Sequence, residues 1–253
     1  MGYQALLFDL DGTLLQSDCS VSKRTLEVLE TLHKRGLLLG IATARSGNSA
    51  ASLLPELHPD ITISSGGALV ECGGARVLRR SFTLEETRVI LRGAKALCGP
   101  DCEILADTVE GDFRNYRECG AGWSGSILTD FQMVSKPALR ICVRMGDPAQ
   151  ASELARRLND CSWIRFSRTD WYQFTKAGVS KEQALMDLCR KIGLSAGDVI
   201  AFGDDVTDIG MLSHCGKGVA MGNAVEEVKR AADVVIGDHD RDGIADYLTE
   251  TLL

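Results

Sequence analysis

The sequence is short of the features that mark several common classes of protein. No apolar run approaches the roughly 20 residues that a membrane-spanning helix requires. Basic residues form no local cluster and are outnumbered, since 28 Lys and Arg face 35 Asp and Glu, for a formal net charge of −7. Anionic lipid surfaces and nucleic-acid backbones both attract basic surfaces. We therefore expect neither a membrane nor a nucleic acid as a partner.

Cysteine and histidine spacing excludes the usual zinc and disulfide frameworks. The nine cysteines are scattered and form no CxxC pair, and the four histidines form no HxH or HExxH pattern. Structural zinc needs closely spaced ligand pairs, and disulfide frameworks belong mostly to smaller secreted chains. The first residues carry acids within an apolar stretch and no basic leader, so no signal peptide is expected. The prediction is a cytoplasmic protein with reduced thiols.

Strand and helix signals alternate in the first and last thirds of the chain. A helix predicted over residues 23–35 can be capped by Ser22 and stopped by Gly36. Such alternation predicts right-handed crossovers and a parallel sheet, which defines an α/β protein. The predicted strands are 3–10, 37–42, 61–64, 199–202, 218–220 and 234–236, and the further helices are 181–192, 206–214, 224–230 and 243–252.

The middle of the chain has a different pattern, typical of an α+β unit. Thr83 and Glu86 form a capping-box signature for a helix to about residue 97, and Asp147-Pro148 opens another helix to about 158. Strands are predicted near 103–106 and 139–143, and a hairpin over 163–166 and 171–175 around Arg168. The chain therefore divides into one domain over 1–81 and 176–253 and an inserted domain over 82–175.

Two aspartates at the end of the first predicted strand are the most informative residues. Asp9 and Asp11 stand in the segment FDLDGTL, and at this spacing both side chains project to the same side. The carboxyl end of a strand in an open parallel sheet faces the ligand crevice. Two carboxylates this close repel each other unless a cation joins them or one is protonated. Hard oxygen ligands at a crevice suit Mg²⁺.

A second acidic cluster follows the strand predicted over 199–202. Gly203 permits a sharp turn, after which Asp204 is expected to face the same crevice as Asp9 and Asp11. Asp208 falls within the next helical turn, where it can cap the helix or brace the site. Capping alone explains one of these acids but leaves the others without a role.

Candidate anion-binding groups lie at two other predicted helix starts. Ser180 and Gln183 form a capping-box pattern that places Lys181 at the first helical position, where a bound anion would offset an otherwise unfavourable cation. Thr43 and Ala44 offer a hydroxyl and free amides after the strand over 37–42, although an ordinary helix cap explains this segment better when it is taken alone. Metal-binding acids combined with oxyanion-binding groups are what phosphoryl transfer requires.

The order of these motifs resembles the haloacid dehalogenase (HAD) superfamily of phosphohydrolases. The four superfamily motifs correspond to DLDGT at 9–13, Thr43, Lys181 and GDDVTD at 203–208. The match is closest to the Cof-like subclass, to which GVSK before the helix and VAMGNA at 219–224 are also similar. The resemblance implies a Rossmann-like parallel-sheet core with an inserted α+β cap domain of the C2 type. One departure is Thr207, where Cof-like members usually have Asn.

The resemblance also implies a role for each motif residue. Asp9 would be the nucleophile that forms an aspartyl-phosphate, and Asp11 the general acid and base. Mg²⁺ would be held by the Asp9 carboxylate, the Asp11 backbone carbonyl and Asp204, with Asp208 orienting Lys181 or a metal-bound water. The phosphoryl oxygens would be bound by Thr43, the Ala44 amide, Lys181 and Thr207.

The expected substrate is a small phosphorylated molecule, such as a sugar phosphate or a similar phosphomonoester. A phosphomutase on the same scaffold, or a non-catalytic regulatory protein that kept the fold, are the alternatives. In this family the cap domain selects the leaving group. Four residues of the inserted region lie in stretches that could face the site, although Tyr and Trp are more often packing residues: Arg114, Tyr116, Arg117 and Trp123.

Overall fold

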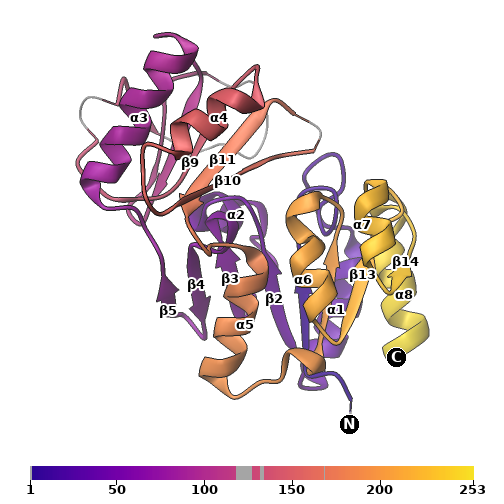
Figure 1. The fold of residues 1–253 in the computed structure, drawn as a ribbon. Coiled ribbons are helices and arrows are strands. Elements are labelled where there is room, and N and C mark those ends of the chain that lie inside the picture. Colours follow the sequence, from indigo (N-terminus) through magenta and orange to yellow (C-terminus); the bar gives the residue numbers. More distant parts are fainter. Residues whose placement is uncertain (1, 118–126, 132–133, 168) are drawn as a thin grey trace. The chain divides into compact units, whose positions relative to one another are not determined.

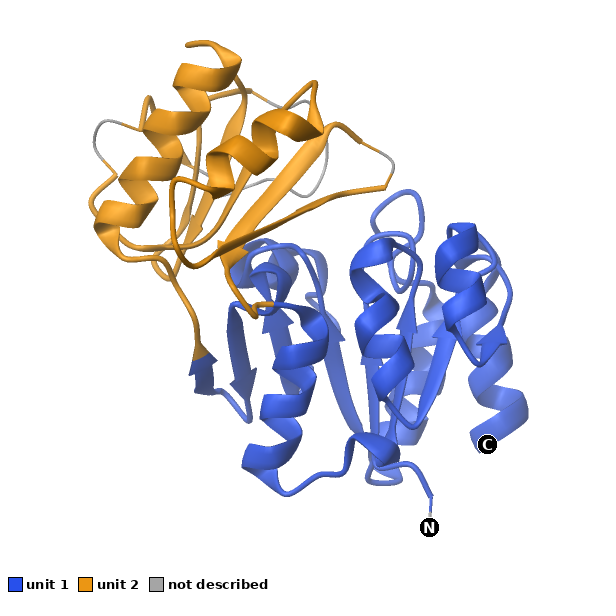
Figure 2. Ribbon diagram, viewed as in Figure 1, with its two compact units in different colours: residues 1–78, 180–253 blue, residues 79–179 orange. Residues whose placement is uncertain are grey.

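The computed structural model describes residues 2–117, 127–131, 134–167 and 169–253. Two compact units divide the chain, unit 1 (Met1–Leu78 and Ser180–Leu253) and unit 2 (Arg79–Val179), which are coloured separately in Figure 2. The borders expected from the sequence lie a few residues inside unit 2. Trp123 and Arg168 lie outside the described residues.

Unit 1 is built on an eight-stranded sheet with the order β14-β13-β12-β1-β2-β3-β4-β5. The strands from β14 to β3 are parallel, as the alternating pattern predicts. Their bounds are β1 (Ala5–Phe8), β2 (Leu38–Ala42), β3 (Ile61–Ser64), β12 (Val199–Gly203), β13 (Lys217–Ala220) and β14 (Val234–Val235). β1 therefore lies between β12 and β2, and these three neighbouring strands bring the second acidic cluster and the Thr43 loop to the same edge as Asp9.

An edge hairpin extends this sheet and was not expected from the sequence. β4 (Leu69–Cys72) runs antiparallel to β3, and β5 (Ala75–Arg79) is its outer neighbour. The connection is the Gly73-Gly74 turn, in which both glycines have positive φ. Both strands are short, and the outer strand β5 has no buried residue. They therefore lack the clear apolar period that marked the parallel strands.

Successive side chains of each strand point to opposite faces of the sheet. In unit 1 both sets are apolar, so helices cover both faces. Leu6 and Phe8 of β1 belong to a core with α1 and α8, and Ala5 and Leu7 belong to a second core with α5, α6 and α7. In Figure 1, α1 and α5 accordingly lie on opposite sides of the sheet. The bounds are α1 (Lys23–Lys34), α2 (Gly47–Leu53), α5 (Lys181–Ile192), α6 (Ile209–His214), α7 (Glu226–Ala231) and α8 (Gly243–Leu252).

Unit 2 has a six-stranded sheet with the order β10-β11-β9-β6-β7-β8, and two helices pack on one face of it. Its core includes Ile90 of α3, Leu154 of α4 and Phe174 of β11. The helices are α3 (Leu84–Cys98) and α4 (Pro148–Ala155), and the strands are β6 (Ile104–Thr108), β7 (Asp112–Arg114), β8 (Ile127–Leu128), β9 (Ala138–Arg144), β10 (Cys161–Arg165) and β11 (Trp171–Lys176). The inserted unit therefore has the α+β architecture expected from the resemblance.

Local signals set the helix starts as predicted in three cases. Ser22 accepts a hydrogen bond from the Thr25 amide, Thr83 and Glu86 form a complete capping box, and Asp147 caps a helix with proline at its first turn. No helix in the described parts of the chain is both long enough and apolar enough to span a bilayer. Tyr116 packs against Trp171, with ring centroids 5.3 Å apart, as expected of a packing residue.

Candidate active site

Asp9 and Asp11 follow β1 directly, but the two side chains have different surroundings. The Asp9 amide donates to the Phe202 carbonyl of β12 at 3.0 Å, so the backbone of Asp9 is held by the pairing of β1 with β12. Asp9 is buried, with 6% of its surface exposed, whereas the Asp11 side chain is 52% exposed. The two carboxylates therefore differ in their exposure to solvent, although both follow the same strand.

Lys181 lies at the start of α5 and pairs with two carboxylates. Its Nζ donates to Asp9 Oδ1 at 2.5 Å and to Asp208 Oδ1 at 2.6 Å, and the lysine is 2% exposed. Burial alone would lower the pKa of Lys181, but Asp208 and Asp9 outweigh it and raise the pKa above its usual value. The ammonium is therefore charged at every physiological pH.

Burial raises the pKa of Asp9 well above its ordinary value of 3.8. Lys181 opposes this rise, while the neighbouring carboxylates Asp208, Asp204 and Asp11 add to it. Three carboxylates lie near the buried Asp9, so the single positive charge of Lys181 does not fully stabilise the ionised form of Asp9. A further cation at the site would relieve this repulsion.

Asp208 supports the site from within the turn after β12. Its Oδ2 accepts hydrogen bonds from the Asp204 and Asp205 amides at 3.0 and 3.1 Å. Gly203 allows the turn to close this tightly, because a Cβ on Gly203 would lie 2.5 Å from the Asp208 Cβ. Since Lys181 donates to Oδ1, Asp208 contacts both the turn and the lysine.

The donor groups fit a divalent cation. One carboxylate oxygen each of Asp9, Asp204 and Asp208 lies within 4.8 Å of the others, and all three residues are buried. Together with Lys181, these groups carry a formal charge of −2 when ionised. Buried charge of this size is costly unless it is compensated, and carboxylate oxygens are the ligands that Mg²⁺ prefers. The Asp11 carboxylate does not belong to this group of three.

Arg45 instead contacts Asp11, a pairing that the sequence analysis missed. The Arg45 guanidinium donates from Nε to Asp11 Oδ2 and from Nη2 to Oδ1, both at 2.7 Å. Arg45 is also tied to Thr43, whose Oγ1 accepts from the Arg45 amide at 3.0 Å. The sequence places Arg45 two residues after Thr43, which marks it as a residue near the site. No local sequence pattern could show that it pairs with a carboxylate 34 residues earlier.

The start of α2 differs from the prediction for the Thr43 segment. Ser46, three residues later, is the N-cap and accepts from the Ser49 amide, so Thr43 caps no helix. Thr43 is fully buried, and Ala44 and Thr207 are half-buried. The Thr43 hydroxyl oxygen accepts from the Arg45 amide, and a hydroxyl that accepts one hydrogen bond can still donate its proton. Thr207 precedes Asp208 in the short 3₁₀ turn Val206–Asp208.

The cap of α5 is also simpler than the predicted capping box. Ser180 Oγ accepts from the Gln183 amide at 3.0 Å, but the Gln183 side chain donates to Asp187. A glycine turn, which the sequence analysis overlooked, packs on this helix start. Gly67 has φ 104°, and a Cβ there would collide with the Ser180 carbonyl carbon at 2.5 Å.

The same turn is bonded to the Thr43 loop. The Gly66 amide donates to the Thr43 carbonyl at 3.0 Å, and the Ser65 amide donates to the Arg45 carbonyl at 2.7 Å. The Ser65–Gly67 turn therefore joins the Thr43 segment to the backbone that carries Lys181. Its signal in the sequence was the run SSGG at 64–67, which is compatible with a tight turn.

Comparison with known proteins assigns the chain to a family. A family model described as haloacid dehalogenase-like hydrolase matches residues 6–111 and 127–248. Because the match covers most of the chain, the protein belongs to the haloacid dehalogenase-like hydrolases. The resemblance drawn from the four motifs is thereby confirmed.

Particular relatives match over nearly the whole length. An HMP-PP phosphatase of Cronobacter sakazakii is 28% identical, over 97% of this chain and 94% of that protein. A phosphoglycolate phosphatase of Methanopyrus kandleri is also 28% identical, over 98% and 96%. The solved structure of the HAD subclass IIB sugar phosphatase BT4131 superimposes with a TM-score of 0.84 at 24% identity, over 98% of each chain. This likeness confirms the predicted fold class.

Proposed function

We propose that the protein is a Mg²⁺-dependent phosphatase that hydrolyses small phosphomonoesters, such as sugar phosphates or similar metabolites, through an aspartyl-phosphate. The observation that carries this proposal is the buried Asp9 carboxylate, which lies 2.5 Å from the Lys181 ammonium and shares an acidic cluster with Asp204. The phosphatase names of relatives that match nearly the whole chain support the reaction class.

Asp9 is the nucleophile in this proposal. Lys181 and the β12 ladder hold it in a single orientation, so that little freedom is lost when it attacks phosphorus. The attack forms a bond between an Asp9 carboxylate oxygen and phosphorus and breaks the bond from phosphorus to the ester oxygen. Hydrolysis of the aspartyl-phosphate then returns the carboxylate and releases phosphate.

The carboxylates of Asp9 and Asp204 and the backbone carbonyl of Asp11 would hold Mg²⁺. The ion, when bound, supplies the positive charge that lets an anionic nucleophile meet an anionic phosphate. Phosphoryl oxygens would be bound by the Thr43 hydroxyl, the Ala44 amide, the Lys181 ammonium and the Thr207 hydroxyl. A hydroxyl at Thr207 can donate to a phosphate oxygen as the more usual Asn would.

Asp11 would protonate the leaving alcohol and then take a proton from the attacking water. Its half-exposed side chain can meet both, and Arg45 fixes its direction through two parallel hydrogen bonds. Asp208 acts through Lys181 and the Asp204 amide, so it is a positioning residue.

The test is phosphate release across a panel of sugar, nucleotide and acid phosphates, with Mg²⁺ or with EDTA. We expect release with Mg²⁺ only, and we expect Asp9→Asn to abolish it while far-UV circular dichroism stays unchanged. Undiminished turnover in Asp9→Asn would refute the aspartyl-phosphate mechanism.

The same assay separates the alternatives. A hydrolase frees phosphate without a bisphosphate activator, whereas a mutase would require the activator and would return an isomeric ester. A non-catalytic protein would bind a phosphate ester without turnover by the wild-type chain. The complete set of motif acids favours hydrolysis, since loss of the nucleophile or a metal acid is the common mark of a non-catalytic relative.

A further inference from the structure

The loop after β13 is bonded to the backbone on both sides of the acidic cluster. The Met221 amide donates to the Gly203 carbonyl, and the Val225 amide donates to the Asp204 carbonyl, each at 3.1 Å. Between them, Asn223 Nδ2 donates to the Gly12 carbonyl at 2.7 Å. This loop therefore links the turn that follows Asp9 and Asp11 to the turn that carries Asp204.

The Asn223 amide is engaged at both ends. Its Oδ1 accepts from the His239 backbone amide at 3.2 Å while its Nδ2 donates to Gly12. A donor and an acceptor are therefore both needed, and among side chains of this size only an amide provides them in this geometry. The position requires asparagine for its hydrogen bonds and not for its volume alone.

The turn held by Asn223 lies directly against the Asp204 carboxylate. Thr13 Oγ1 donates to Asp204 Oδ1 at 3.1 Å. Gly12 has φ 80°, and a Cβ on it would lie 2.5 Å from Asp204 Oδ2. The turn thus holds Asp204 Oδ1 through Thr13, and Gly12 packs close to Oδ2, so a displacement of Gly12 and Thr13 would move the carboxylate.

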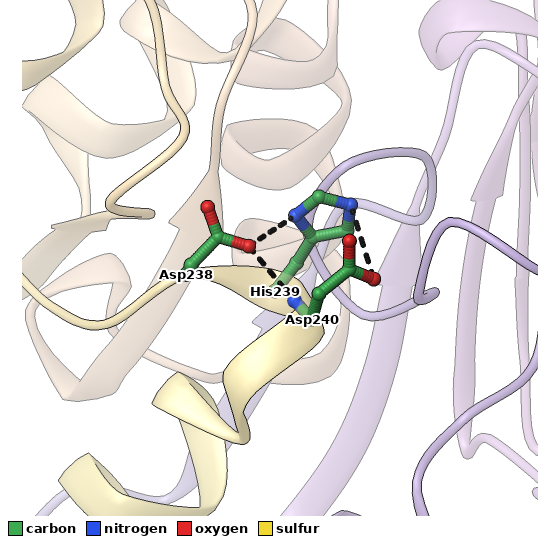
Figure 3. Close-up of side chains that lie close together, drawn as sticks. All are labelled: Asp238, His239 and Asp240. Atoms are coloured by element: carbon green, nitrogen blue, oxygen red, sulfur yellow. Dashed lines mark hydrogen bonds and ion pairs between the residues drawn. The ribbon is translucent and has the colours of Figure 1, made fainter.

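A second contact ties the segment after Gly12 and Thr13 to the 3₁₀ turn His239–Arg241, which Asn223 also contacts. The Ser17 amide and hydroxyl donate to Asp240 Oδ1 and Oδ2 at 2.8 and 2.6 Å, and Ser17 Oγ lies 3.3 Å from His239 Nε2. These hydrogen bonds lower the pKa of Asp240. Figure 3 shows Asp238, His239 and Asp240 turned toward one another, with Asp238 Oδ1 3.0 Å from the ring Nδ1 of His239 and accepting a hydrogen bond from the Asp240 amide. The 3₁₀ turn His239–Arg241 is therefore held by hydrogen bonds both to Ser17 and to Asn223.

We propose that Asn223 is a positioning residue for cation binding, acting through Gly12 and Thr13 on the Asp204 carboxylate. The inference rests on the proposed function, because it assumes that Asp204 is a ligand of Mg²⁺. Residues that orient metal ligands from outside typically change metal affinity or activity about 10–100-fold when they are mutated. Nothing in the four motifs assigns a role to this asparagine.

The test measures Mg²⁺ binding to the metal-free protein by titration calorimetry, and the rise in Tm that MgCl₂ produces. We expect Asn223→Ala to weaken Mg²⁺ binding about 10–100-fold and to reduce the Mg²⁺-induced rise in Tm. Ser17→Ala, at the exposed anchor, should fold normally and weaken binding in the same direction to a smaller extent. Asn48→Ala is the matched control, since Asn48 is exposed in unit 1 and should keep wild-type affinity.

The outcomes separate the two proposals. Unchanged Mg²⁺ affinity in Asn223→Ala and Ser17→Ala, even with a lower Tm, would show that the network is merely structural and would overturn the inference. If the wild-type chain itself binds no Mg²⁺, the metal requirement of the proposed function fails, and the role of Asn223 fails with it. Weaker binding in both variants with an intact control supports the assignment.

Discussion

Arg45 and Asp11 form an ion pair with two hydrogen bonds, in which the arginine is the less exposed partner. The guanidinium side chain is 10% exposed and the carboxylate is 52% exposed, and each of the two hydrogen bonds measures 2.7 Å. A planar fork of this kind fixes the plane of the carboxylate as well as its distance. Arg45 therefore orients the group to which we assign proton transfer.

Replacing Arg45 with lysine should separate orientation from charge. Arg45→Lys keeps the positive charge but cannot donate two parallel hydrogen bonds, and misplacement of a reacting group by about 1 Å can cost about 100-fold in rate. We expect kcat to fall by about 10–100-fold in steady-state assays with little change in Tm. Arg24→Lys is the matched control, because Arg24 pairs with Asp246 at an exposed position. Equal kcat values for both variants would contradict the positioning role.

Gly67→Ala should disturb the start of α5. The added Cβ meets the Ser180 backbone, and the positive φ alone costs roughly 1–2 kcal/mol for a residue with a side chain. Gly73→Ala supplies the comparison, since Gly73 also has positive φ but has open space at the Cβ position. We expect both to lower Tm, and only Gly67→Ala to lower kcat as well, because it moves the backbone of Lys181. A kcat loss in both would point to general destabilisation.

The raised pKa of Asp9 predicts a stability profile for the metal-free protein. A carboxyl whose folded pKa lies above its usual value of 3.8 stabilises the fold while protonated, and this contribution is lost as the pH rises from about 4 through the folded pKa. Urea unfolding in EDTA should therefore show that the free energy of unfolding of the wild type declines as the pH rises above about 4. The decline should be shallower in Asp9→Asn. Added Mg²⁺ should restore stability to the wild type at neutral pH. Parallel profiles for the two proteins would refute the burial effect.

A buried ion pair in unit 2 should matter more than an exposed one. Arg140 donates from Nε to Asp107 at 2.7 Å, and both residues are almost fully buried. Arg140→Met leaves an uncompensated buried carboxylate, which typically costs about 3–5 kcal/mol. The comparison is Arg144→Met, whose pairs with Glu103 and Asp170 are exposed and worth about 0–1 kcal/mol. Denaturant unfolding measures both, and similar losses would contradict this ranking.

Sequence patterns predicted the parallel strands and most helix starts because these depend on neighbours along the chain. Apolar runs such as 5–8 must lie inside a sheet, and a cap such as Thr83 with Glu86 is a local hydrogen-bond pattern. The edge hairpin over 69–79 was missed, since its short strands carry no comparable period. The sheet order predicts that Asp9 and Asp204, at the ends of neighbouring parallel strands, lie close together, and carboxylate oxygens of the two residues lie within 4.8 Å of each other.

The rest of the site depends on contacts that no local pattern encodes. Lys181 meets Asp9 across 172 residues, and Asn223 meets Gly12 across 211. Whether the lysine is exposed to solvent or buried between two carboxylates follows only from how α5 packs on the sheet. The sequence shows which groups are available, and the tertiary fold decides which of them share a proton or a hydrogen bond.

The whole candidate site is carried by unit 1, and unit 2 enters the chain between two segments of unit 1. Every residue to which we assign a role in phosphoryl transfer belongs to unit 1, and the chain leaves it after β5 and returns just before α5. The departing and returning segments are held together at their roots, where Arg80 donates to the Gly178 carbonyl at 3.0 Å. The inserted domain is thus attached outside the central ladder of β12, β1 and β2. The register that sets Phe8 beside Phe202, one residue before Asp9 and Gly203, lies wholly within unit 1, so a change in the size of the inserted domain leaves this alignment intact.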